Sequence, residues 1–130
     1  MKSPTLFALA GLLMSAQAAE PTGTLTLACT GTEAYQGGAG TSSEQQINIS
    51  ITVDFQKKSV TGLSDSRVAI SNVDETTITL SGAATGWVMN GGIDRVTGSL
   101  YAVSIRSDPS TRQTILSISY NLQCQPALGR

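Results

Sequence analysis

The sequence predicts an all-β fold, with about eight antiparallel strands in a small closed or nearly closed barrel. Three observations lead to this prediction. Apolar and polar residues alternate in several segments, as expected for strands with one buried face. Residues typical of tight turns separate these segments at the spacing of hairpins. After residue 18, no apolar stripe of helical period runs for three turns, which argues against a major helix.

The first eighteen residues have the features of a secretory signal peptide. Lys2 supplies a positive charge, residues 6–14 form an apolar run, and Ala16-Gln17-Ala18 matches an A-x-A cleavage site. The apolar run is too short to cross a bilayer as a helix, which takes about 20 residues. We therefore expect residues 1–18 to be cleaved and residues 19–130 to form a single β domain. This domain would be periplasmic or secreted, with no membrane insertion after cleavage.

Three segments alternate most clearly, and in each of them we expect the apolar set to face the core. The inward sets are Leu25, Leu27 and Cys29 near the start, then Ile47, Ile49, Ile51, Val53 and Phe55, and finally Leu116, Ile118, Tyr120, Leu122 and Cys124. Weaker alternation predicts strands between them, with the inward rows Val68 and Ile70; Ile78 and Leu80; Trp87, Met89, Gly91 and Ile93; and Tyr101, Val103 and Ile105. Residues 60–63 are a further short candidate. The abundance of Thr, Ser, Val and Ile suits a pleated, half-buried surface.

The connections between these segments have the chemistry of hairpins. Residues 56–59 and 72–75 lie between predicted strands, and Asp108-Pro109 suits the start of a type I turn. In residues 94–98, Asp94 can accept backbone N–H bonds while Gly98 takes a left-handed conformation. Residues 31–43 are rich in Gly, Ser and Thr, and their number predicts a mobile or functional loop.

Cys29 and Cys124 are the two cysteines of the chain, and both fall in phase with the apolar sets of their strands. In an exported chain they predict a structural disulfide between the first and last strands. A redox-active pair is expected closer together, as C-x-x-C beside a helix start. A sheet whose first and last strands meet is a barrel, and closure removes exposed edges. A two-sheet β-sandwich would also bring the cysteines together, and it is the alternative.

The chain lacks the residues that most catalytic and metal sites use. It has no histidine, which removes Ser-His-Asp and Cys-His arrangements and histidine-ligated metals. Six of its nine acidic residues fall at predicted turns or strand ends, where turn formation in solvent accounts for them: Asp54, Asp65, Asp74, Glu75, Asp94 and Asp108. We therefore expect no enzymatic activity, no cofactor and no metal.

The charged side chains and the remaining distinctive residues do not indicate a binding site. Without Lys2 the chain has seven basic and nine acidic side chains, a net charge of −2, and no basic stripe that would bind nucleic acid. Trp87, the only tryptophan, is expected to plug the core or a barrel mouth. Arg95 and Arg106 are expected to be exposed and solvated.

Two stretches resemble known groups of proteins. Ile93-Asp94-Arg95-Val96-Thr97-Gly98, followed by the C-terminal Tyr120-x-Leu122-x-Cys124-x-Pro126, resembles small exported bacterial all-β proteins of unknown function. That resemblance is best over the last forty residues, and it implies fold and export without an activity.

Thr97-Gly98-Ser99-Leu100-Tyr101 is similar to the Ser-Gly-x-x-Tyr loop of the C-type periplasmic lysozyme inhibitors, with Thr in place of Ser. The resemblance implies an eight-stranded barrel with a disulfide, in which Thr97, Gly98 and Tyr101 contact a lysozyme.

The leading functional hypothesis is therefore a non-enzymatic binding module of the periplasm, whose partner is an envelope protein or a small apolar ligand. A lysozyme inhibitor is its sharpest version. The alternatives are a lipocalin-like carrier of a small apolar ligand and a structural role through residues 31–43.

Overall fold

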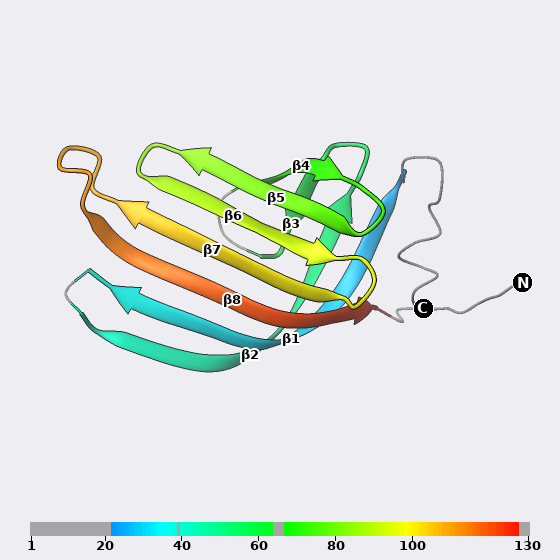
Figure 1. Cartoon of the computed structure of the whole chain (residues 1–130), viewed down its shortest axis with the longest axis horizontal. Coiled ribbons are helices and arrows are strands. Elements are labelled where there is room, and N and C mark those ends of the chain that lie inside the picture. Colours follow the sequence, from blue (N-terminus) through cyan, green and yellow to red (C-terminus); the bar gives the residue numbers. More distant parts are fainter. Residues whose placement is uncertain (1–21, 39, 64–66, 128–130) are drawn as a thin grey trace, which may run out of the picture.

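Eight antiparallel strands make up the part of the chain that the computed structural model describes, residues 22–38, 40–63 and 67–127. They are β1 (Thr24–Gly37), β2 (Ser42–Asp54), β3 (Ser59–Thr61), β4 (Val68–Val73), β5 (Thr77–Ala84), β6 (Trp87–Asp94), β7 (Ser99–Ser107) and β8 (Thr114–Pro126). Each strand pairs with the next along the chain, and β8 also pairs with β1, which closes a barrel (Figure 1). The predicted antiparallel barrel is confirmed, and the β-sandwich alternative is wrong. The predicted signal peptide, residues 1–18, and the turn acid Asp65 lie outside the described residues.

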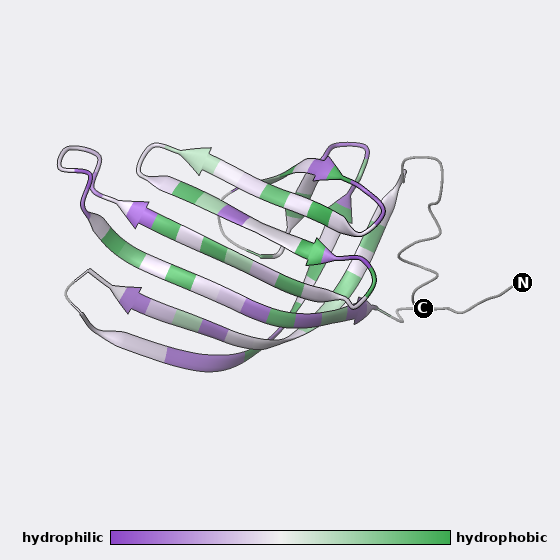
Figure 2. Cartoon of the chain, viewed as in Figure 1, coloured by the Kyte–Doolittle hydropathy of each residue, from purple (hydrophilic) through white to green (hydrophobic). Residues whose placement is uncertain are grey.

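The inward faces of the strands form one hydrophobic core. Its buried members are Leu27, Cys29, Ile51, Val53, Val60, Leu63, Val68, Ile70, Ile78, Leu80, Trp87, Met89, Ile93, Leu100, Ala102, Tyr120, Leu122 and Cys124. Figure 2 shows the corresponding alternation of hydrophobic and hydrophilic residues along the strands. The predicted phases of the first, second and last segments are confirmed, as are those of the rows that begin at Val68, Ile78 and Trp87. Complete burial of a side chain such as Leu27 contributes about 2 kcal/mol.

Strand β7 is where the predicted phase is wrong. The expected inward row of Tyr101, Val103 and Ile105 faces outward, and the side chains of Tyr101 and Ile105 are 56% and 36% exposed. The inward row of β7 is Leu100, Ala102 and Ser104, all of them buried. Both rows contain apolar residues, so alternation alone does not decide which one faces the core.

The reason for this orientation is the size of the neighbouring core residues. Ala102 lies opposite the buried Tyr120 of β8 on one side and opposite Gly91 of β6 on the other. A Cβ atom on Gly91 would collide with the Cβ atom of Ala102. Small residues on β6 and β7 thus leave room for the Tyr120 ring inside a narrow barrel, where small and large side chains alternate.

Residues 31–43 do not form the long loop that was predicted. Strand β1 continues to Gly37, β2 begins at Ser42, and their ladder extends to Gln36 opposite Ser42. On its other side this part of β1 pairs with β8, as far as Gly37 opposite Leu116. Composition misled the prediction, because pairing on both sides satisfies the backbone groups of β1 whatever its side chains are.

The strands differ in length, and this makes the two ends of the barrel different. Strands β1, β2 and β8 have 13 or 14 residues, whereas β3 has three and β4 has six. We call the end with the turns after β2, β4 and β6 the disulfide end. At the opposite end, the long strands β1, β2 and β8 extend beyond the shorter ones (Figure 1).

A disulfide joins β1 to β8. Cys29 and Cys124 lie directly opposite in this ladder, their Cα atoms are 4.0 Å apart, and their sulfur atoms are bonded. Hydrogen bonds from Ala127 N to Thr26 O, and from Gly38 N to Ile115 O, show which pairs of the ladder are hydrogen-bonded. The alternation makes the cysteines a non-hydrogen-bonded pair, in which opposed side chains approach most closely. The predicted disulfide is confirmed, and it spans a sequence separation of 95.

Replacing both cysteines by alanine, Cys29→Ala with Cys124→Ala, is expected to lower the free energy of unfolding by about 2–5 kcal/mol. The unfolded chain then regains the freedom that a link across nearly the whole domain removes. Urea unfolding, followed by the fluorescence of Trp87, measures the change. As a control, reductant should destabilise the original protein and leave the double variant unaffected. Equal unfolding midpoints for the two proteins would contradict the prediction.

Candidate functional site

The turn between β6 and β7 carries the residues that the sequence singles out for partner binding. Asp94 Oδ1 accepts hydrogen bonds from the backbone N–H groups of Val96, at 2.8 Å, and Thr97, at 3.0 Å. The Gly98 N–H donates to the Asp94 carbonyl oxygen at 2.8 Å, and Gly98 has a φ of 83°. The predicted turn, with its aspartate acceptor and its left-handed glycine, is confirmed.

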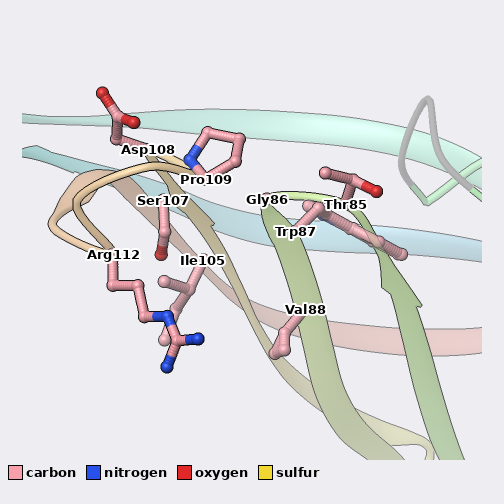
Figure 3. A pocket seen from close by; sticks show the side chains of 9 residues that line it. All are labelled: Thr85, Gly86, Trp87, Val88, Ile105, Ser107, Asp108, Pro109 and Arg112. Carbon is pink, nitrogen blue, oxygen red and sulfur yellow. The ribbon is translucent and has the colours of Figure 1, made fainter.

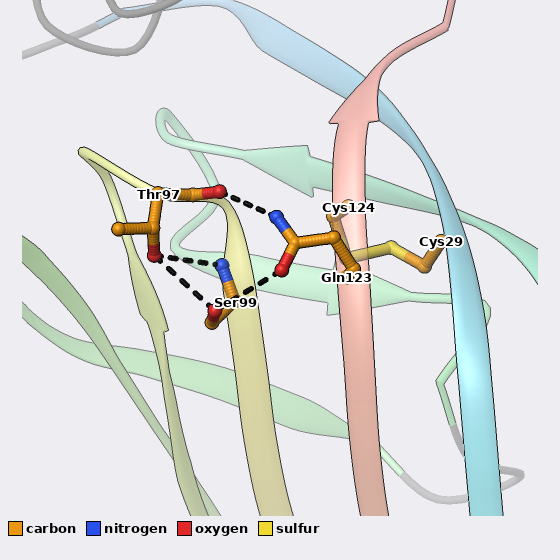
Figure 4. Close-up of a disulfide and its surroundings, with 5 residues drawn as sticks. All are labelled: Cys29, Thr97, Ser99, Gln123 and Cys124. Atoms are coloured by element: carbon orange, nitrogen blue, oxygen red, sulfur yellow. Dashed lines mark hydrogen bonds between the residues drawn. A yellow bond between two sulfur atoms is a disulfide. The ribbon is translucent and has the colours of Figure 1, made fainter.

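Thr97 and Gly98 attach this turn to β8, beside the disulfide (Figure 4). The Thr97 hydroxyl donates to Ser99 Oγ at 3.2 Å, and the Thr97 carbonyl accepts a hydrogen bond from Gln123 Nε2. The Gly98 carbonyl accepts the Cys124 N–H at 2.9 Å. A Cβ atom on Gly98 would collide with the Cys124 carbonyl oxygen, so this position requires glycine on grounds of space as well as φ. Both residues therefore have a structural role next to the ladder between β1 and β8 that closes the barrel, which we call the seam.

Tyr101, the third of these residues, lies on the outer face of β7 and belongs to a row of exposed apolar side chains. We call Val88, Tyr101, Val103, Ile105 and Ile115 the outer strip. Four of them are between 36% and 56% exposed, and Val103 is partly exposed. Val88 lies directly opposite Ile105, and Ile115 lies on β8 where the register with β7 shifts, next to the pair of Arg106 and Leu116. In the structure Tyr101 is thus exposed together with other apolar side chains, whereas the prediction placed it in the core.

At the end opposite the disulfide, the outer strip borders a hollow of about 400 Å³ (Figure 3). Its lining comes from the β5–β6 turn, the β7–β8 turn and the strand ends beside them: Thr85, Gly86, Trp87, Val88, Ile105, Ser107, Asp108, Pro109 and Arg112. A hydrogen bond of 2.9 Å from Ser107 N to the Gly86 carbonyl holds the two turns together. The exposed side chains of Val88 and Ile105 join the hollow to the strip.

Four of the predicted turn acids, all of them aspartates, do form turns. Besides Asp94, the Oδ1 atoms of Asp54, Asp74 and Asp108 each accept two backbone N–H groups of the turn that follows. Backbone N–H donors hold the pKa of Asp74 and of Asp94 below the ordinary value, and Ser110, chiefly through its hydroxyl, does the same to the pKa of Asp108. Among the residues that the structure describes, no three His, Cys, Asp or Glu side chains gather where they could hold a metal ion.

Arg95 is not the exposed cation that was predicted, whereas Arg106 is exposed as expected. The Arg95 side chain is 5% exposed, and its Nη1 donates to the Asp74 carbonyl at 2.6 Å. Burial lowers the pKa of Arg95, and the charge of Asp74 opposes that effect. The Arg95 N–H also donates to the Thr76 carbonyl at 2.7 Å. Arg95 therefore joins the β6–β7 turn to the β4–β5 turn. No sequence pattern predicts this long-range contact.

Trp87 occupies the core, as predicted. Its side chain is 5% exposed, and its Nε1–H donates to Ser104 Oγ at 2.9 Å, within the barrel. The six-membered part of the indole ring lies against Gly82 of β5, where a Cβ atom would collide with it. Ser104, which sequence reasoning passed over, supplies the acceptor that a buried indole N–H requires.

In comparisons with protein-family models, with curated proteins and with solved structures, none matches this chain. The fold therefore defines the class of the protein: an antiparallel barrel whose first and last strands are joined by a disulfide. Such a bond is consistent with an oxidising compartment outside the cytoplasm. None of the described residues forms a helix that is long and apolar enough to cross a membrane.

Gly98→Ala is expected to destabilise the protein more than Gly23→Ala does. Both glycines have a similar positive φ, 83° and 79°, so each substitution carries a backbone cost of about 1–2 kcal/mol. Only Gly98 has a backbone oxygen in the way, and overpacking adds about 1–3 kcal/mol there. Urea unfolding of the two variants measures the difference. Equal losses would contradict the assigned contact with Cys124.

The depressed carboxylate pKa values predict a loss of stability in acid. Because the folded pKa of Asp94 lies below its unfolded value, the stability that this group contributes is present above about pH 4 and is lost as the pH falls through the folded pKa. Asp94→Asn should therefore flatten the dependence of unfolding free energy on pH below about 4. The control is Glu75→Gln, at the exposed acid of the β4–β5 turn. Parallel pH profiles for Asp94→Asn and the original protein would contradict the prediction.

Proposed function

We propose that this chain is a non-enzymatic binding module, exported to the periplasm or secreted, whose partner is an envelope protein. The observation that carries the proposal is the outer strip, in particular Tyr101 with 56% of its side chain exposed. Exposed apolar residues in a contiguous row are a common mark of a protein interaction site. Tyrosine is also enriched among the residues that contribute most to binding energy.

The hollow beside Val88 and Ile105 supports the same proposal. It offers a recess of about 400 Å³ next to exposed apolar side chains, into which a partner can insert an apolar side chain of its own. Arg112 supplies a cation at the wall of this recess. Asp108 lines the same recess, so the apolar anchor is the feature that a fitting partner needs.

A lysozyme inhibitor is the sharpest version of the proposal, and it rests on the resemblance of residues 97–101. Gly98 is buried and Thr97 is exposed but bonded to β8 through its carbonyl, so Tyr101 is the large apolar side chain that this motif offers to a partner. In this version Tyr101 enters the lysozyme, and the two other residues keep the hairpin in place.

The packing of the barrel interior favours a partner on the outer surface over a small ligand inside, as in the lipocalin-like alternative. A carrier of that kind needs an internal cavity of roughly 300 Å³ or more. In this barrel, large side chains such as Leu27, Ile51 and Leu80 occupy the interior with at most 1% exposure. An outer surface is therefore the better candidate for recognition.

The inhibitor version predicts that the purified protein slows the clearing of a cell-wall suspension by lysozyme. Tyr101→Ala should raise the half-inhibitory concentration by about 30-fold, the effect of losing a central contact residue. The control is Thr26→Ala, at an exposed residue of β1 outside the strip, which should leave the inhibition unchanged. No inhibition of any lysozyme type at micromolar protein would end this version.

The broader proposal is tested by the strip itself. A charge introduced by Ile105→Asp should abolish chemical cross-linking of the purified protein to its envelope partner, because a buried unpaired carboxylate opposes docking. Thr26→Asp places the same charge on an exposed site of β1 and should leave the cross-link unchanged. If both variants keep the cross-link, or both lose it while still folded, the strip is not the binding surface.

A further inference from the structure

Strand β2 has a long edge without a pairing partner among the described residues. On one side, β2 pairs with β1 along its whole length, from Ser42 to Asp54. On the other side, its pairing is confined to the last three residues, which face β3. Gly62, just after β3, packs against the backbone of Ser50. The stretch from Ser42 to Asn48 thus forms an open edge at the end opposite the disulfide (Figure 1).

The register shows which backbone groups point out of this edge. At the two ends of the β1–β2 ladder, Gly37 N donates to Thr41 O and Phe55 N donates to Gly23 O. Hydrogen-bonded and non-hydrogen-bonded pairs alternate in an antiparallel ladder, so the odd-numbered residues of β2 bond to β1. The even-numbered residues direct their N–H and C=O groups away from β1. They are Ser42, Glu44, Gln46 and Asn48.

Apart from the one charge of Glu44, this edge lacks the features with which monomeric proteins keep such edges from pairing. The segment contains no lysine and no proline, and its register with β1 runs without a bulge. The side chains from Ser42 to Gln46 are exposed, and Figure 2 shows this half of the strand as hydrophilic. A regular, uncovered edge of this kind is a template for another strand.

We propose that a second copy of this chain covers the edge, with the two β2 strands antiparallel about a two-fold axis at Gln45. In this register Ser42 lies opposite the partner's Asn48, and Glu44 lies opposite the partner's Gln46. All four outward-directed residues then bond to the same four residues of the partner, through about eight backbone hydrogen bonds. The segments β8–β1–β2 of the two copies join into one continuous sheet.

Charge and the inner face of the strand favour a second copy as the occupant. Glu44 is the only charged side chain between Ser42 and Ile49, and the two-fold register sets it against an amide instead of another carboxylate. On the inner face, Ile47 is only half-buried and lies opposite the partner's Ser43. The joined sheet would cover this side chain. The segment is thus self-complementary in backbone, charge and length.

Gln45→Cys tests the register directly. The two-fold axis makes residue 45 a non-hydrogen-bonded pair with itself, with Cα atoms about 4.5 Å apart, a distance that a disulfide can bridge. Under mild oxidation, Gln45→Cys should give a covalent dimer. The control is Asn90→Cys, at an exposed residue of β6 that is paired on both sides, and it should stay monomeric under the same conditions.

Gln46→Pro tests the edge without disturbing the barrel. The Gln46 N–H points away from β1, so proline removes no hydrogen bond within the chain. Sedimentation should show a dimer of the original protein and a dissociation constant at least about tenfold higher for Gln46→Pro, because two symmetry-related bonds are lost. Gln46→Thr, which keeps the N–H, should leave the constant nearly unchanged, and the thermal unfolding of all three proteins confirms their fold.

A protein that sediments as a monomer up to its solubility limit would overturn the proposal, and so would a dimer that Gln46→Pro leaves intact. A dimer cross-linked by Asn90→Cys and not by Gln45→Cys would place the interface elsewhere and overturn it as well. The edge lies on β2 and the outer strip on β6, β7 and β8, so either proposal can fail while the other stands.

Discussion

The pairing of β1 with β8 is the constraint on which the rest of this structure depends. Every other ladder joins strands that follow one another along the chain and can form as a hairpin or short connection. The closing ladder instead joins the two ends of the domain, so it carries the largest loop-closure entropy. The disulfide between Cys29 and Cys124 lies within this ladder and keeps its register fixed. A slip of β8 by one residue would turn Cys124, and the apolar set of that strand, away from the core.

The closing ladder also organises the disulfide end. The Gly98 carbonyl bonds to the backbone of Cys124, so the β6–β7 turn is held directly against the cross-linked strand. Gln123, the residue before that cysteine, bonds to Thr97 and Ser99 from the other face of β8. Gln123 and Cys124, two neighbouring residues of β8, therefore hold the β6–β7 turn, and Cys124 also holds the ladder with β1. Thr97 and Gly98 therefore have structural roles in the turn, whereas the Tyr101 side chain lies exposed on the outer face of β7.

Much of the fold could be predicted from the sequence because burial imposes a period of two on most strands. The rows that begin at Leu25 and Ile47, and the aspartate turns, follow from local patterns. The orientation of β7 could not be predicted, because both of its faces are apolar and the choice depends on space beside Tyr120. The environment of Arg95 could not be predicted either, since its acceptor, the Asp74 carbonyl, is 21 positions away. The outer strip was missed for the same reason, because its β7 residues had been assigned to the core.

Both candidate surfaces follow from the geometry of a small barrel. Beside Trp87 and Tyr120 the inward residues of β7 are the small Ala102 and Ser104, and the larger Tyr101, Val103 and Ile105 lie on the outer face. The ladder that closes the barrel requires β1 and β8 to be long, and β2 follows β1 through a tight turn over its whole length. Strand β3 is too short to cover it. An exposed apolar face and an exposed backbone edge thus arise on opposite sides of the seam, and a partner for one need not compete with a partner for the other.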